Sequence, residues 1–108
     1  MNNKIEIANV IKRLNEPKIL IIGDFAIDEM VYGKTARISR EAPVLILKHS
    51  ETKIILGAAS NAAHNISALN SGKVKVIGVC GKDYYAPVLM KAFKDAKIDC
   101  SLMVEDKE

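Results

Sequence analysis

The sequence is poor in aromatic residues: its 108 residues include two phenylalanines, three tyrosines and no tryptophan. Proteins that bind single-stranded nucleic acid stack bases on aromatic side chains, and this chain offers few of them. It also lacks a block of charge of one sign, because 16 Lys and Arg are interleaved with 13 Asp and Glu and the net charge is only +3. We therefore expect no nucleic-acid partner.

Cysteine is scarce as well. Cys80 and Cys100 are too far apart for a CxxC redox or zinc motif, and no cluster of His, Cys and acidic residues has the spacing of metal ligands. We expect both cysteines to be small apolar core residues, and the sequence predicts no metal site.

Long apolar runs are missing. No run approaches the length that spans a bilayer. The N-terminal region mixes Glu6, Lys12 and Arg13 among its apolar residues, which is not the pattern of a signal peptide. The sequence therefore predicts a cytoplasmic protein with no membrane partner.

The remaining composition is that of a globular protein. The chain is 49% hydrophobic and 27% charged, which argues against disorder. A chain of this length fits one domain with a modest core.

The chain begins with a predicted helix and a predicted strand. Ile7, Val10 and Ile11 recur at helical spacing and Pro17 closes the segment, which indicates a short amphipathic helix. The run from Lys18 to Gly23 is continuously apolar and β-branched after its first residue. This pattern predicts a central parallel strand buried on both faces.

The next segment predicts a small antiparallel sheet and then a helix. Short β-prone pieces, separated by turn-like residues, cover residues 30–32, 44–48 and 53–56. The alanine-rich stretch from Ala59 to Leu69 follows, and it predicts a helix that Gly72 terminates.

The last third alternates strand and helix again. Val74 to Cys80 predicts a buried strand, Asp83 is a candidate N-cap for a helix running to about Ala96, and Cys100 to Val104 starts another strand. The alternation is typical of an α/β fold, here a parallel sheet with flanking helices and a small antiparallel β flap. Because a strand begins so near Glu108, we expect this sheet to be incomplete at its C-terminal side.

Two carboxylates, Asp24 and Asp28, follow the first predicted strand. In open α/β sheets, ligands gather at the carboxyl ends of the strands. One interpretation is that Asp24 caps a turn and Asp28 is merely solvated. The other is that an ionised carboxylate accepts hydrogen bonds from two neighbouring hydroxyls of a polyol. The residues alone leave both open.

A run of small residues, Gly57 to Asn61, joins a predicted strand to a predicted helix. Small side chains let a ligand approach the backbone, where the free N–H groups of a helix start would face it. Close packing of a helix on a sheet produces the same pattern. Asn61 adds an amide that can donate and accept hydrogen bonds toward a sugar hydroxyl.

Several motifs together resemble the ribokinase family of carbohydrate kinases. They are Gly23-Asp24, Tyr32-Gly33, Arg37-Ile38-Ser39, Glu41-Ala42-Pro43 and the Gly-rich helix start with Asn61. Within that family they are most similar to the heptose 7-phosphate kinase domain of bifunctional ADP-heptose synthesis enzymes. The likeness runs from about Lys18 to Val104, which is nearly the whole chain.

The resemblance implies that residues 1–108 are the N-terminal portion of a ribokinase-like kinase domain that phosphorylates a sugar phosphate at its anomeric hydroxyl with ATP. It implies that Asp28, Gly57 and Asn61 bind the sugar.

The resemblance also implies that residues 30–56 form a β lid, and that such lids pair in a homodimer. Arg37 lies in this stretch and could bind the phosphate of a sugar phosphate, since a guanidinium fork matches phosphate oxygens. An arginine on a solvated hairpin is the alternative.

Two departures from the family bear on activity. Relatives carry two successive glycines where this chain has Gly57-Ala58, so a methyl group narrows the approach to the sugar. The family motif Asp-Thr-x-Gly-Ala-Gly-Asp, which supplies the catalytic base and the anion hole, does not occur in the sequence.

Phosphoryl transfer requires the nucleotide, metal and nucleophile to be held in line, so we assign no catalytic residue and expect the fragment alone to be inactive. ATP and magnesium would bind the intact parent enzyme and not this fragment. The alternative is a noncatalytic dimerising module derived from a sugar kinase.

Overall fold

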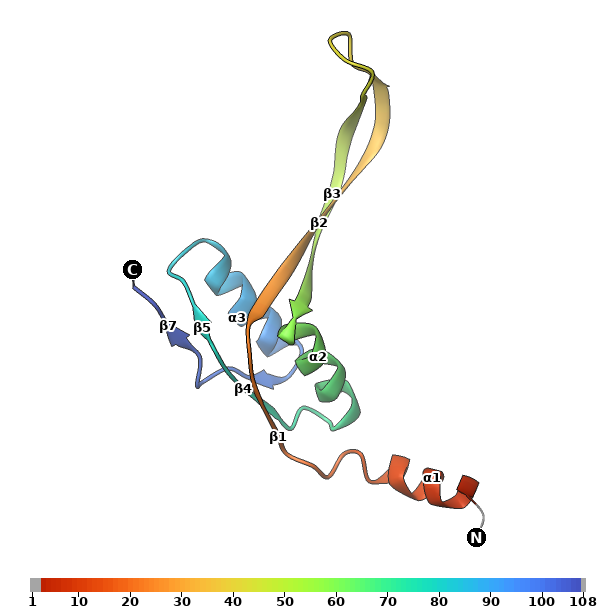
Figure 1. Ribbon diagram of the computed structural model, residues 1–108, viewed down its shortest axis with the longest axis vertical. Coiled ribbons are helices and arrows are strands. Elements are labelled where there is room, and N and C mark those ends of the chain that lie inside the picture. The colour runs from red at the N-terminus through yellow and green to blue at the C-terminus, as the bar shows by residue number, and fades with distance from the viewer. Residues whose placement is uncertain (1–2, 108) are drawn as a thin grey trace.

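The computed structural model describes residues 3–107. Its elements, in chain order, are α1 (Asn3–Lys12), β1 (Ile19–Ile22), β2 (Phe25–Ile38), β3 (Leu45–Ala58), α2 (Ala59–Leu69), β4 (Val74–Ile77), β5 (Val79–Cys80), α3 (Tyr85–Asp95), β6 (Ile98–Asp99) and β7 (Val104–Glu105). Parallel strands alternate with helices around one long antiparallel hairpin (Figure 1). The predicted α/β class is confirmed.

The body is built on a parallel sheet of order β1-β4-β6, in which Ile19, Val74 and Ile98 lie side by side. Val74, Val76 and Ile98 are buried because α2 and α3 pack on their face of the sheet. The alternate side chains of β1 point to the other face, where Leu20 and Ile22 are 51% and 74% exposed.

The prediction of a central strand buried on both faces is therefore wrong for β1. It lies at the edge of the sheet, and in residues 3–107 the helices cover only one face. A continuous apolar run is the same in both situations, so the sequence could not separate them.

The hairpin of β2 and β3 is longer than the sequence indicated. The two strands pair from Phe25↔Ala58 out to Ile38↔Leu45. The three short strands predicted between Met30 and Leu56 are thus two strands of 14 residues each. The expected breaks near Gly33 are shifts in register within continuous pairing, because a bulge absorbs an irregular residue without ending a strand.

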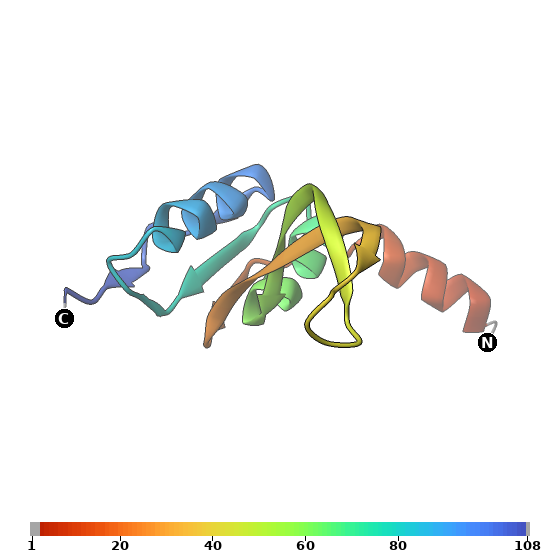
Figure 2. The same ribbon diagram turned by 90° about the horizontal axis from the view of Figure 1, so that it is seen from above.

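Figure 1 shows this hairpin projecting from the body as a twisted arm, and Figure 2 looks along it from its tip. The Cα radius of gyration is 19.5 Å and the molecule extends over 67 × 43 × 19 Å. The turn at the tip closes where the amide of Ser39 donates to the carbonyl of Val44 at 2.8 Å.

The remaining boundaries follow the predictions in part. The helix from Ala59 to Leu69 is confirmed as α2. The carboxylate of Asp83 accepts hydrogen bonds from the amides of Tyr85 (3.0 Å) and Ala86 (2.9 Å), as expected of a residue that caps α3.

The two strands predicted in the last third are confirmed only in part. Val74 to Cys80 splits at Gly78 into β4, which pairs with β1, and β5, which pairs with β7. A Cβ at Gly78 would lie 2.5 Å from the Phe25 ring, so no side chain fits where the chain passes from the first sheet to the pairing of β5 with β7. Cys100 to Val104 is a turn followed by β7.

The two cysteines sit at the margin of the core. Cys80 and Cys100 are both half-buried, and Cys100 packs against the buried cluster. Burial is the main cause that raises the pKa of the Cys80 thiol. Both cysteines are thus less buried than the prediction that they are core residues implied.

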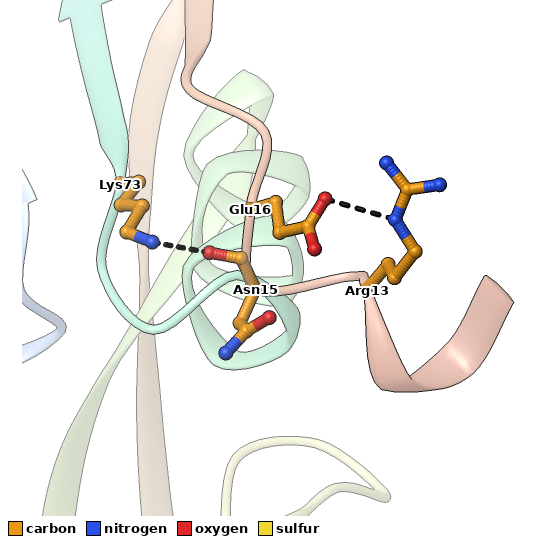
Figure 3. A network of polar contacts seen from close by, with 4 residues as sticks. All are labelled: Arg13, Asn15, Glu16 and Lys73. Atoms are coloured by element: carbon orange, nitrogen blue, oxygen red, sulfur yellow. Dashed lines mark hydrogen bonds and ion pairs between the residues drawn. The ribbon is translucent and has the colours of Figure 1, made fainter. Parts of the chain in front are cut away.

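The N-terminal helix is joined to the body through the segment that follows it. Figure 3 shows Arg13 paired with Glu16 at 3.0 Å and the ammonium of Lys73 donating to the backbone carbonyl of Asn15. The side chain of Asn70 also donates to the carbonyl of Pro17 at 3.1 Å. The apolar residues of α1 stay exposed, so the amphipathic helix is formed but unpacked. No helix in residues 3–107 is long and apolar enough to cross a membrane.

Candidate functional site

The candidate site lies at the carboxyl end of β1, where the hairpin begins and α2 starts. A Cβ at Gly23 would be 3.0 Å from the Cβ of Ala59, so the end of β1 approaches the first turn of α2 closely. The amide of Ala59 donates to the carbonyl of Asp24 at 3.1 Å, and the amide of Ala26 donates to the hydroxyl of Ser60 at 3.2 Å. These contacts fasten residues 23–28 to residues 57–61.

Asp28 and Gly57 are brought together at the base of the hairpin. Ala26 pairs with Gly57 and Asp28 with Ile55, so the Asp28 and Gly57 positions are diagonal neighbours on one face. The carboxylate of Asp28 is exposed and has no hydrogen-bond or ion-pair partner among residues 3–107. It is therefore available to a ligand.

Ala58 adopts a backbone conformation that favours glycine, with φ 50° and ψ −133°. It immediately precedes α2 and makes no side-chain cap to the helix. The Ala58 methyl group, at a position where the resemblance implies glycine, thus sits on a strained residue next to Gly57.

Asn61 lies in the first turn of α2, four positions after Gly57, and is exposed. Position 61 therefore lies close to the junction of β3 and α2. Its contact with a sugar stays a prediction.

Arg37 is far from the other predicted site residues. It lies in the outer part of β2, opposite Ile46 and beside a shift in register. Nine positions separate it from Asp28, which corresponds to about 30 Å along an extended strand. In this conformation, Arg37 and Asp28 of the same chain cannot contact one small ligand, and the role of Arg37 stays a prediction.

Three residues at the hairpin base were not singled out from the sequence. Ser60 is fully buried and holds the amide of Ala26. The hydroxyl of Tyr85 donates to the carboxylate of Glu29 at 3.0 Å, across 56 positions of sequence. A serine in the alanine-rich first turn of α2 was a weak sequence signal for the contact between Ser60 and Ala26. No sequence signal indicated the contact between Tyr85 and Glu29.

A cavity of about 210 Å³ opens beneath the hairpin base. It lies between β2, β5 and α3, and Phe25, Cys80, Asp83 and Tyr85 are among its lining residues. Asp28, Gly57 and Asn61 do not line it. Within residues 3–107, no group of three or more His, Cys, Asp or Glu residues is arranged to hold a metal ion.

Comparison with known proteins identifies the family. Residues 16–108 match the profile of the pfkB family of carbohydrate kinases, which is most of the chain. The chain belongs to this family. The ribokinase-type resemblance of the motifs is therefore confirmed.

Curated relatives share sequence across the same region. The chain is 39% identical over 88 residues to the "Bifunctional protein HldE" of Histophilus somni, 40% over 87 residues to that of Geobacter sulfurreducens and 41% over 90 residues to that of Helicobacter hepaticus. These matches cover 82%, 81% and 83% of this chain but only 18% of each relative. The chain thus spans about a fifth of the length of the proteins it matches.

Proposed function

We propose that the chain forms the sugar-binding floor and the lid of a kinase that phosphorylates heptose 7-phosphate at its anomeric hydroxyl. The observation that carries the proposal is the unpaired carboxylate of Asp28 against Gly57, at the carboxyl end of β1. Membership of a carbohydrate kinase family and the matches to HldE proteins support it.

The polar groups of the candidate site suit a polyol ligand. An ionised carboxylate accepts hydrogen bonds from two neighbouring hydroxyls, and such charge-assisted bonds are stronger than neutral ones. The absence of a side chain at Gly57 lets the Asp28 carboxylate keep its position, since a Cβ there would lie 2.6 Å from one of its oxygens, and the Asn61 amide can both donate and accept. Together these groups would bind the sugar and orient it.

The chain does not supply the nucleotide half of the reaction. The Asp-Thr-x-Gly-Ala-Gly-Asp segment, from which the family resemblance derives the catalytic base and the phosphate-binding amides, is absent from the sequence. We therefore place ATP and magnesium in the intact parent enzyme, and this fragment alone binds sugar without turnover.

The hairpin is the proposed lid, and a second copy is its proposed partner. In the described residues β2 and β3 form a two-stranded sheet, so each strand has an unpaired outer edge. Large apolar side chains on the arm are exposed, among them Val31, Ile38, Leu45 and Leu47. Such edges and side chains favour pairing with another hairpin. They equally favour the second candidate function, a noncatalytic dimerising module.

Isothermal titration with heptose 7-phosphate and with ATP tests the proposal. The wild-type chain is expected to bind the sugar phosphate and not ATP. Asp28→Asn should weaken sugar binding about 10- to 100-fold, which corresponds to losing hydrogen bonds to a charged group. Glu41→Gln removes one negative charge at the exposed hairpin tip and serves as the matched control. ATP binding without sugar binding would contradict the assignment.

A further inference from the structure

We propose that the Tyr85–Glu29 hydrogen bond fixes the angle of the hairpin over the sugar site, which makes both side chains positioning residues. The ligand in this inference is the one named by the proposed function, but the geometry of the hydrogen bond does not depend on that proposal. The bond joins the hairpin to the first residue of α3, and the amide of that residue is itself held by Asp83.

The inner end of the hairpin is anchored in the core. Phe25 is buried and meets Phe93 edge to face, with ring centroids 5.6 Å apart and an interplanar angle of 87°. Leu56, two positions before the end of β3, is only 6% exposed. These contacts fix where the arm leaves the body, but they lie close together and leave its tilt to contacts further out.

Glu29 lies just beyond these anchoring contacts, where the strands become exposed. Glu29 pairs with Ile54, which is 39% exposed, and the neighbouring Ile55 and Met30 are 46% and 42% exposed. The hydrogen bond to Tyr85 therefore joins the arm to α3 further out than the buried residues Phe25 and Leu56. About nine positions of β2 extend beyond it, roughly 30 Å of strand, so a tilt of about 10° there would move the tip by about 5 Å.

The same contact controls Asp28. Asp28 and Glu29 are consecutive in β2, so their side chains point to opposite faces of the hairpin. Glu29 reaches α3, while Asp28 lies on the face of Gly57. Because the two residues share one paired stretch of backbone, a rotation released at Glu29 turns the Asp28 carboxylate away from the start of α2.

The contact with Glu29 also keeps the phenol of Tyr85 protonated. Its phenol faces Glu29, with Asp83 and Tyr84 nearby, and the hydrogen bond to Glu29 is the main cause that raises the pKa of Tyr85. The hydroxyl therefore keeps its proton, and so remains a donor, past the pH at which an ordinary tyrosine ionises.

Distance measurements between two spin labels test the positioning role without any ligand. One label at Ser50 on the arm and one at Asn65 on α2, with Cys80 and Cys100 replaced by serine, report the angle of the hairpin. Tyr85→Phe, which keeps the ring, and Glu29→Ala should both broaden the distance distribution. Glu29→Gln keeps an acceptor oxygen and should restore it. Tyr84→Phe, at the neighbouring 79%-exposed tyrosine, should leave it narrow.

Titration with heptose 7-phosphate completes the test. Tyr85→Phe should weaken binding by about two- to tenfold, and Tyr84→Phe should not. An unchanged distribution in Tyr85→Phe, or equal broadening in Tyr84→Phe, would overturn the inference. If the wild-type chain binds no sugar phosphate while Tyr85→Phe still broadens the distribution, the proposed function fails and the positioning contact stands.

Discussion

The carboxylate of Asp28 occupies the space that a side chain at Gly57 would need. A Cβ at Gly57 would lie 2.6 Å from one carboxylate oxygen and 3.0 Å from the other. A methyl group would therefore push the carboxylate aside while the backbone stays in place, since the group in the way is the end of a side chain.

Gly57→Ala is expected to weaken binding of heptose 7-phosphate about tenfold with little change in melting temperature. Isothermal titration and thermal unfolding measure the two effects. Gly81→Ala is the matched control, because a Cβ there would meet only the Asp83 carboxylate at 3.9 Å. A large fall in melting temperature for Gly57→Ala, with affinity intact, would make Gly57 a packing residue.

Ala58→Gly is expected to stabilise the chain by about 1 kcal/mol, because it removes a positive-φ strain that exceeds the entropic cost of glycine. The same substitution at Ala68, an exposed residue inside α2, should destabilise by about 1 kcal/mol. Urea unfolding of both variants gives the two free energies. Equal losses at both positions would show that Ala58 carries no strain.

Gly78→Ala is expected to destabilise the chain by about 1–3 kcal/mol. Its Cβ would lie 2.5 Å from the Phe25 ring and 2.9 Å from the carbonyl oxygen of Gly23, and the latter is backbone that cannot move alone. Chemical unfolding measures the loss. Combining the change with Phe25→Leu should recover part of it, and full additivity would place the clash elsewhere.

Acid should weaken the turn after β6. The hydrogen bond from Ser101 lowers the pKa of Asp99, with a smaller contribution from Lys75. A depressed folded pKa gives stability that is present above the unfolded value, near pH 4, and is lost as pH falls through the folded value. Asp99→Asn should flatten the curve of unfolding free energy against pH on the acid side of about pH 5. An unchanged slope would contradict the assignment.

Self-association should depend on the arm. Leu45→Lys, near the tip, is expected to weaken dimer formation about tenfold or more, because it places a charge in the proposed apolar contact. Ile7→Lys on α1 changes an equally exposed residue, 59% against 61%, and should have no effect. Sedimentation equilibrium over a range of concentrations distinguishes them. A monomeric wild-type chain would refute the lid pairing.

Local signals predicted much of the fold. The alanine-rich composition of Ala59 to Leu69 is a property of that segment alone, and α2 has those bounds. The Asp83 cap likewise depends on residues two and three positions away. The exposure of one face of β1 depends instead on which helices cover the sheet, and the close approach at Gly78 depends on the ring of Phe25. No local pattern contains that information.

The candidate site divides in the same way. Asp28 and Gly57 could be chosen from the end of a strand and the start of a helix, and the structure places them in contact. The conformation of Ala58 and the pairing of Glu29 with Tyr85 could not, because the first arises at the junction of β3 with α2 and the second only once the hairpin is folded against α3. Arg37 was assigned because a guanidinium matches phosphate oxygens, and the length of β2 places it far from Asp28.

The projecting arm also governs how the protein behaves in a chromatography column. A compact chain of this size has a radius of gyration of about 13 Å, against 19.5 Å here. A single copy will therefore elute early, at the volume of a heavier globular standard. Retention volume alone would make a monomer look like a dimer, so the mass must come from light scattering or from sedimentation.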